Sequence, residues 1–355
     1  LHLTGWQSRF LLFGQSKKIF VKEILMGESN FGREDSRGDW SPDKPISYGP
    51  LFAWPPKPKA LVTWFFGIPG YLLPWNVAYA IAAIGIWFFL TPSLDHFQKL
   101  SVFWFGMLLV RNLGLALIVY GAWHLWLYVF RKQGTNFKYN RKWPDGNSKR
   151  FTFNNQTYDN MFWTLASGVP IWTCYEMLLL WAYSNGYATI INPVESPVAF
   201  TLIFLLVPFV HEVGFYFAHR LLHWPPLYRI AHQVHHRNTN PGPWSGLSMH
   251  PIEHVIYFSS VLIFFVIPAH PVHMINLISR LGVAPAEGHT GFDRIVTGEE
   301  TSVDRSYYAH YLHHKYFEVN YADGMVPLDK WFGSFHDGTP EAHEKMKERR
   351  RRRGV

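Results

Sequence analysis

The sequence has almost no cysteine, since Cys174 is the only one in the chain. A single thiol cannot form a disulfide within the chain, and it cannot supply the thiolates of a cysteine-rich metal site. Charge is also scarce, because Asp, Glu, Lys and Arg together make up 16% of the residues. The net charge of +8 is not accompanied by a recognisable nucleic-acid-binding motif, so we expect no nucleic-acid partner.

Apolar residues are abundant instead: 48% of the chain is hydrophobic and 18% is aromatic. These proportions are typical of a membrane protein. Four apolar runs have about the twenty residues needed to span a bilayer of roughly 30 Å. The predicted spans are, approximately, Leu72–Leu90, Leu113–Phe130, Met161–Ala182 and Val198–Phe217.

The loops between these spans differ in positive charge. The loop from 131 to 150 carries seven Lys and Arg residues, whereas the loop from Tyr183 to Ser196 carries none. Because positive loops stay on the cytoplasmic side, we expect both termini and the histidine-rich region there. That location corresponds to the endoplasmic reticulum in a eukaryote and to the inner membrane in a bacterium.

Other segments complete the predicted organisation. Two shorter apolar runs, His254–Ile267 and Met274–Val283, are separated by PAHPVH and predict a re-entrant hairpin. Arg111 falls just before the second predicted span, and we interpret it as a boundary residue that snorkels to the interface. We divide the chain into an interfacial segment and loop (1–60), transmembrane helices (61–218), a histidine-rich region that includes the hairpin (219–336) and a basic tail (337–355).

Histidine spacing gives the strongest signal. His219 and His223 stand four residues apart, and His232, His235 and His236 follow within eighteen residues of the first. Each set would lie along one helix face, and the intervening WPP should end the first helix so that the sets face each other. A lone histidine is usually a packed core residue, but five at this spacing predict a metal site. With nitrogen ligands it would suit iron, zinc, copper or manganese.

Further histidines follow in the same region: fifteen of the nineteen lie between His211 and His336. HYLHH repeats the spacing of the second set, with histidines at 310, 313 and 314. His270 and His273 fall in the predicted hairpin turn, and we do not expect them to be ligands.

The motifs HRLLH, HQVHH, HPIE, HTGFD, HYLHH and NYADGMVPLDKWFGSF, in this order, resemble the sterol desaturase and fatty acid hydroxylase superfamily of membrane di-iron oxygenases. Sterol C5-desaturases and methylsterol oxidases look most similar. The resemblance covers roughly Phe209 to Phe335. Together with the apolar runs, it predicts an all-α integral membrane protein with about four transmembrane helices, a re-entrant hairpin and a cytoplasmic histidine-rich cap.

The resemblance also implies roles for individual residues. The implied ligands of two iron ions, which zinc could replace in purified protein, are His219, His223, His232, His235, His236, His289, His310, His313 and His314. The residues implied either to bind a metal or to orient a ligand are His250, His254, His211, Glu212 and Asp293. Asp329 and Gly333 match a closing motif that we interpret as structural.

The implied reaction is hydroxylation or desaturation of an unactivated C–H bond in a lipid, with O2 as oxidant. Motif details favour a sterol-like or isoprenoid substrate over a fatty acyl chain. Because no haem-binding domain is apparent, we expect an external electron donor that is cytochrome b5-like or ferredoxin-like.

Two alternatives remain open from the sequence. A zinc-dependent membrane hydrolase could use the same imidazoles with Glu212 or Glu253 as base. A non-catalytic subunit of a membrane complex could keep the metal site for stability and dock through the N-terminal segment. Within the spans, His124 and Glu176 are equally compatible with a functional role and with hydrogen-bonded packing.

Overall fold

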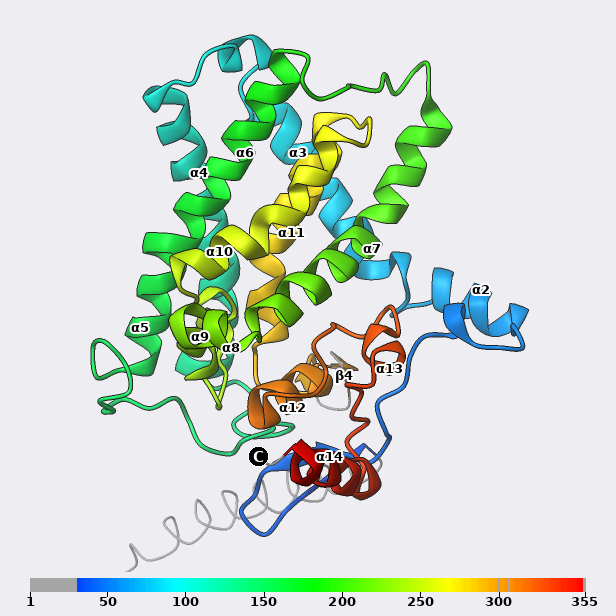
Figure 1. Ribbon diagram of the computed structural model, residues 1–355, viewed down its shortest axis with the longest axis vertical. Helices are drawn as coiled ribbons and strands as arrows, with labels where there is room; N and C mark the ends of the chain where they lie inside the picture. The colour runs from blue at the N-terminus through cyan, green and yellow to red at the C-terminus, as the bar shows by residue number, and fades with distance from the viewer. Residues whose placement is uncertain (1–30, 299–300, 305–306, 354–355) are drawn as a thin grey trace, which may run out of the picture.

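The computed structural model describes residues 31–298, 301–304 and 307–353 (Figure 1). These residues are mostly helical, with two short antiparallel sheets, so the all-α prediction is confirmed. The amphipathic segment predicted at the start of the chain lies outside the described residues. In chain order the elements are β1 Gly32–Glu34, β2 Trp40–Pro42, η2 Pro50–Phe52, α2 Pro58–Phe66, η3 Leu72–Asn76, α3 Val77–Leu90, η4 Leu94–Phe97, α4 Val102–His124, η5 Leu125–Val129, α5 Gln156–Trp163, η6 Thr164–Gly168, α6 Val169–Ser184, α7 Pro197–Leu222, α8 Pro225–Leu227, η7 Tyr228–His232, α9 Gln233–His236, η8 Pro243–Leu247, α10 Pro251–Phe258, η9 Ser259–Phe265, α11 Pro271–Gly288, β3 Arg294–Val296, β4 Ser302–Asp304, α12 Tyr308–Tyr316, α13 Leu328–Trp331 and α14 Pro340–Arg353.

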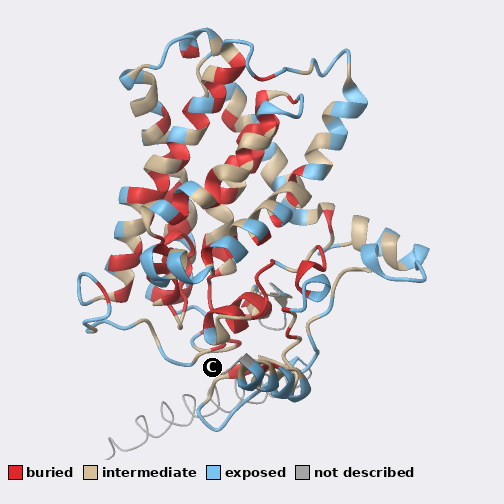
Figure 2. Ribbon diagram, in the orientation of Figure 1, coloured by how far each residue is buried: buried red, intermediate tan, exposed pale blue. Residues whose placement is uncertain are grey.

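Four helical segments are long and apolar enough to cross a membrane, as predicted. The first, second and fourth leave most of their residues unburied, and large apolar side chains such as Phe89 and Val110 point outward. Figure 2 shows this pale outer surface on α3, α4 and the upper half of α7. Because such a surface is stable in contact with lipid, it agrees with a membrane location. The segments are Leu72–Leu90, Val102–Val129, Gln156–Ser184 and Pro197–Leu222.

The second span begins at Val102, eleven residues before the predicted start, and it therefore contains Arg111. The snorkelling interpretation of Arg111 is wrong: its side chain is only 8% exposed and forms an ion pair with Glu176 of α6. Asn112 donates a hydrogen bond to the same Glu176 Oε2 at 3.0 Å. Pairing across the two helices lets the span include residues that interrupt its apolar run. It also gives Glu176 a packing role.

The two shorter apolar runs form a helical hairpin, with α10 and η9 as one arm and α11 as the other. Helix α11 packs against α3, α4, α6 and α7, so it occupies the centre of the bundle (Figure 1). The hairpin tip reaches the loop that follows α6, where the N–H of Ala269 donates to the carbonyl of Thr189 at 3.0 Å. This central hairpin carries the chain back to the histidine-rich end.

The short helices α8, α9, α12 and α13 gather with both sheets beyond one end of the bundle and form a cap (Figure 1). Trp40 of β2 packs with Phe137 and Tyr139 of the α4–α5 connection and with Tyr311 of α12. Figure 2 shows that α12 and the turns around it are largely buried. The cap and the spans therefore enclose the region where the histidines meet.

Candidate metal centre

Helix α7, the fourth of the apolar segments, carries His219 in its last turn and is followed by His223 at its C-terminal end. Trp224 has extended backbone angles before Pro225, so WPP ends the helix as predicted. The Nδ1 atom of His219 lies 2.8 Å from the Tyr321 carbonyl. This hydrogen bond sets the imidazole so that Nε2 faces the other histidines.

The second set lies on η7 and α9, directly after that turn. His232 closes a π-helical turn, a feature common at functional sites, and His235 and His236 lie on the following helical turn. The Nδ1 atom of His232 is 2.7 Å from Glu253 Oε1, and both side chains are almost completely buried. A carboxylate at this position fixes the ring and strengthens its Nε2 as a ligand.

The remaining histidines come from α12 and from the end of α11. His310, His313 and His314 follow the helical spacing of α12, and the His313 Nδ1 lies 2.7 Å from the Val319 carbonyl. Phe317 takes a left-handed conformation (φ 68°), which turns the chain back so that this carbonyl can reach. His289 sits immediately after α11, with Nδ1 2.9 Å from the Pro285 carbonyl.

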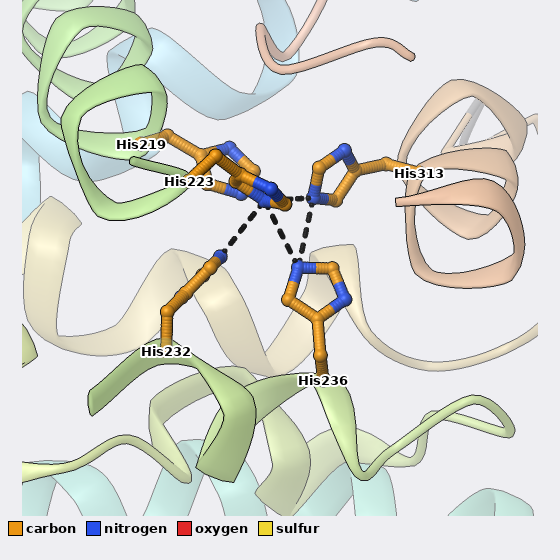
Figure 3. A group of neighbouring side chains, drawn as sticks. All are labelled: His219, His223, His232, His236 and His313. Carbon is orange, nitrogen blue, oxygen red and sulfur yellow. Dashed lines mark hydrogen bonds between the residues drawn. The ribbon is translucent and has the colours of Figure 1, made fainter. Parts of the chain in front are cut away.

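The nine histidines form two groups, in each of which one nitrogen per ring lies within 4.8 Å of the others. Each of the second and third sets splits between the groups, because neighbouring histidines on a helix point in different directions. His235 joins one group and His236 the other, and His313 and His314 divide in the same way. The groups are His219, His223, His232, His236 and His313 (Figure 3), and His235, His289, His310 and His314.

The spacing of the Nε2 atoms suits metal ions. Within the first group the Nε2 of His223 lies 3.0 Å from that of His232 and 3.1 Å from those of His236 and His313. In the second group, the Nε2 of His289 lies 2.9 Å from that of His310. Two nitrogens that each sit about 2.1 Å from one ion at a right angle are separated by about 3.0 Å. A proton on one nitrogen could bridge only one such pair, so these sets fit a metal ion better than hydrogen bonds alone.

Burial also keeps these imidazoles in the form that binds metals. It lowers the pKa of His235 and His314 well below the usual 6.5, with neighbouring histidines adding to the effect. Burial lowers the pKa of His232 to about 3. Neutral imidazoles keep a lone pair free for a cation at physiological pH.

The other candidate ligands lie outside both groups. His254 has both ring nitrogens engaged, with Ser167 Oγ at 3.0 Å and the Leu247 carbonyl at 3.1 Å. His250 caps α10, and its Nδ1 accepts from the Ile252 N–H. His273, like His270, lies at the start of α11 and belongs to neither group.

The acidic candidates bind other partners. Glu212 Oε1 accepts backbone N–H groups of Gly324 at 2.9 Å and Met325 at 3.1 Å, so it fixes the turn of the NYADGM motif. Asp293 Oδ1 accepts from the Tyr139 hydroxyl at 2.9 Å, and burial raises the pKa of Asp293 to about 6. In the described part of the chain, neither carboxylate belongs to the two histidine groups.

Two further residues at the site have roles that the sequence pattern does not predict. The sequence suggests Glu253 only as a hydrolytic base, although its place in HPIE, close to a histidine set, is a usable signal for a ligand-orienting carboxylate. No spacing singles out Tyr321, whose ring centroid lies 4.8 Å from that of His223 and 5.2 Å from that of His313. Asp329 accepts the N–H groups of Tyr321 and Ala322, which agrees with the structural role expected of it.

A cavity of about 300 Å³ lies against one side of the histidines. His219, His232 and His235 line it, so it touches both groups. Its apolar wall includes Phe215 and Met249, which suits an apolar ligand. A lipid in this cavity would place C–H bonds next to the candidate metal positions.

Comparison with known proteins agrees with this geometry. Residues 204–334 match the family model for fatty acid hydroxylase. The chain is 30% identical over 128 residues to the Delta(7)-sterol 5(6)-desaturase of Saccharomyces cerevisiae, covering 36% of this chain and 34% of that protein. It is 27% identical over 166 residues to the enzyme of the same name from Eremothecium gossypii, covering 45% of each.

A plant protein is similar as well. The Delta(7)-sterol-C5(6)-desaturase of Nicotiana tabacum is 28% identical over 156 residues, covering 42% of this chain and 55% of that protein. The fungal matches span less than half the length of those relatives. No solved structure matches. The resemblance to the sterol desaturase and fatty acid hydroxylase superfamily is thereby confirmed.

Proposed function

We propose that this chain, a member of the sterol desaturase and fatty acid hydroxylase superfamily through its residues 204–334, is a membrane oxidoreductase that oxidises a C–H bond of a lipid with O2. The observation that carries the proposal is the convergence of nine histidines in two groups, with neighbouring histidines divided between them. Two adjacent ions held by neutral imidazoles are suited to reductive activation of O2. We assign iron to both positions.

The protein's own residues position and shield this chemistry. Glu253 holds the His232 ring, and backbone carbonyls of Tyr321 and Val319 hold His219 and His313. Each partner accepts a hydrogen bond from the Nδ1–H of its histidine, so the lone pair of Nε2 remains available to bind an ion. Burial of the cluster between the cap and the spans excludes bulk water, which protects an oxidising site from side reactions.

The cavity supports a lipid substrate that enters with an apolar portion against the histidines. The names of the similar proteins favour a sterol-like substrate and desaturation, and an isoprenoid chain fits the same apolar wall. Hydroxylation and desaturation share the first step, removal of one hydrogen from carbon. Desaturation requires a second hydrogen on the neighbouring carbon to be removed before oxygen is transferred.

Electrons would enter beside His223, which does not line the cavity. His223 is the half-buried member of its group, and it lines a second, polar pocket of about 330 Å³ rather than the cavity. Arg220 and Arg349 line the same pocket, and the Arg220 guanidinium lies 4.5 Å from the Tyr321 ring centroid. A basic rim suits the acidic face of a cytochrome b5-like or ferredoxin-like donor.

The cap would face the cytoplasm. The positively charged 131–150 loop lies at the cap end of the bundle, and Arg150 donates to the Arg237 carbonyl close to the second histidine set. Because positive loops remain cytoplasmic, the cluster and the donor would meet on that side.

A zinc hydrolase is less favoured by the geometry. Such an enzyme needs a carboxylate free to act as a base on bound water. Glu212 accepts backbone N–H groups, and Glu253 is engaged with His232. The docking-subunit alternative rests on the N-terminal segment, of which residues 1–30 lie outside the described residues.

The direct test is metal content together with O2 uptake. About two irons per chain and O2 uptake after chemical reduction are expected from protein purified in detergent and reconstituted with ferrous iron. A chain that binds two zinc ions and shows no O2 uptake after iron reconstitution would contradict the oxygenase proposal. The absence of any bound metal would contradict the assignment of the histidines.

A further inference from the structure

The cavity beside the histidines has a second, polar part. Its lining there includes His211, Asn76, Arg280 and Asp323, which come from separate parts of the fold. Arg280 donates a hydrogen bond to Asn76 Oδ1, and His211 Nδ1 lies 4.0 Å from Asp323 Oδ2. The site chemistry proposed above uses none of these four residues.

This polar part lies at a defined distance from the histidine groups. His211 precedes His219 by eight residues on α7, and Arg280 precedes His289 by nine residues along α11. At 1.5 Å per residue these separations are about 12 Å and about 13.5 Å. Both helices run toward α12 (Figure 1), so the polar residues stand at a similar height, about two turns before the ligands.

Two polar atoms in this part have no protein partner. Arg280 Nε and His211 Nε2 are both buried and form no hydrogen bond among the described residues. Leaving such groups unpaired is costly, and native proteins usually pair them with a ligand or water. Both residues line the same cavity, so a polar group of a ligand bound there is the candidate partner of these two atoms.

The two atoms have complementary hydrogen-bonding roles. Arg280 Nε carries a hydrogen and can only donate. The Asp323 carboxylate beside His211 Nδ1 favours the tautomer with the proton on Nδ1, which makes Nε2 an acceptor. A hydroxyl group can accept from the first and donate to the second. A carboxylate can only accept, so it could not donate a hydrogen to His211 Nε2.

We propose that Arg280 and His211 bind the hydroxyl group of the lipid substrate and thereby select a lipid alcohol. This inference rests on the proposed function and names its substrate class. The apolar wall between the two ends, which includes Phe215 and Met249, holds the hydrocarbon.

The experiment compares pairs of probes that differ only in the hydroxyl group. Binding of 5α-cholestan-3β-ol and 5α-cholestane to the full chain in detergent is measured by thermal shift and tryptophan fluorescence. The same is done with octadecanol and octadecane, and with stearate as an anionic probe. For at least one pair, wild-type protein should bind the alcohol about tenfold more tightly than the hydrocarbon.

Two variants test the residues separately. Arg280→Met and His211→Phe should each reduce the alcohol-to-hydrocarbon ratio to about twofold or less, while affinity for the hydrocarbon is kept. Tyr257→Phe is the matched control, because Tyr257 lines the cavity but its hydroxyl already donates to the Leu281 carbonyl at 2.9 Å. The control should retain the wild-type ratio.

Several outcomes would overturn the inference: no discrimination by wild-type protein in either pair, an unchanged ratio in His211→Phe, or tighter binding of stearate than of octadecanol. Since binding needs no turnover, these outcomes are independent of the proposed reaction. Two irons with O2 uptake but no alcohol preference would remove this inference alone. A protein that prefers the alcohol but binds no metal would contradict the proposed reaction and leave this inference standing.

Discussion

His232 Nδ1 lies 2.7 Å from Glu253 Oε1, and the two side chains are 1% and 2% exposed. The pair joins the second histidine set to α10 of the hairpin, so one hydrogen bond connects the metal site to the core of the bundle. Burial raises the pKa of Glu253 well above its usual value, whereas cations bound nearby would favour the carboxylate.

Removing this carboxylate should weaken metal binding without unfolding the spans. Glu253→Ala is expected to lower metal affinity about 10- to 100-fold, because an unoriented ligand loses conformational freedom when it adopts its binding position. Glu253→Gln, which keeps an acceptor oxygen, should lose less. Titration with a competing chelator measures both. The exposed Glu344→Gln is the control, and a Glu253→Ala variant with wild-type affinity would refute this role.

The division of neighbouring histidines predicts the loss of one metal at a time. His235→Ala and His236→Ala should each lower metal content from about two ions per chain to about one, because the two residues belong to different groups. Both variants should still insert into membranes, since insertion depends on the apolar spans. His250→Ala should keep two ions. Equal metal content in His235→Ala and wild type would show that the second group is not a metal site.

Breaking the buried ion pair between α4 and α6 should destabilise the bundle. Arg111→Met leaves Glu176 buried without its cation, so we expect a loss of about 3–5 kcal/mol in the free energy of unfolding. Combining it with Glu176→Met should restore much of that loss. Denaturant unfolding in detergent measures the three variants, with Arg150→Met as an exposed control. A single variant as stable as wild type would contradict this role.

The buried Lys138 should make the free energy of unfolding depend on pH. It is fully buried, with Nζ 2.7 Å from the Asn140 carbonyl, and burial lowers its pKa to about 7. Between pH 7 and about pH 10.5 the unfolded chain holds a proton that the folded chain does not, so wild-type stability should rise with pH by up to about 1.4 kcal/mol per unit.

Lys138→Met should remove this slope, and its stability relative to wild type should be highest near pH 7. Unfolding in detergent at pH 7, 8 and 9 tests the expectation. Lys149→Met, at an exposed position in the same loop, is the control. Parallel pH profiles for wild type and Lys138→Met would mean that Lys138 does not titrate in this range.

The basic rim beside His223 predicts how electrons are delivered. Arg220→Glu should slow reduction by a soluble cytochrome b5 or ferredoxin about tenfold at low salt, and the difference should shrink as salt is added. Reduction by a small neutral mediator should not change. Arg150→Glu, which makes the same change of charge at another position on the cap side, is the control. An equal effect of both variants would argue against a docking site at this pocket.

The sequence by itself determined the four spans, the hairpin, the cap and the histidines that meet. Apolar length and the spacing of His219, His223 and the later sets are local patterns, and helix geometry converts them directly into faces. For the same reason the break at WPP was predictable. The early start of the second span was not, because the charge of Arg111 is balanced by Glu176, which lies 65 residues away in the chain.

Only the tertiary structure decided how the histidines divide into two groups, which carboxylate lies against them and where the polar part of the cavity lies. His235 and His236 are neighbours in the chain but belong to different groups, since adjacent helical residues point about 100° apart. Glu212 and Glu253 were both candidate hydrolytic bases in the sequence, and only Glu212 was expected to orient a ligand. In the fold Glu212 instead accepts the NYADGM backbone, and Glu253 lies against the His232 ring. Arg280 and His211 meet one cavity because α7 and α11 pack together, and no spacing within a single helix encodes that packing.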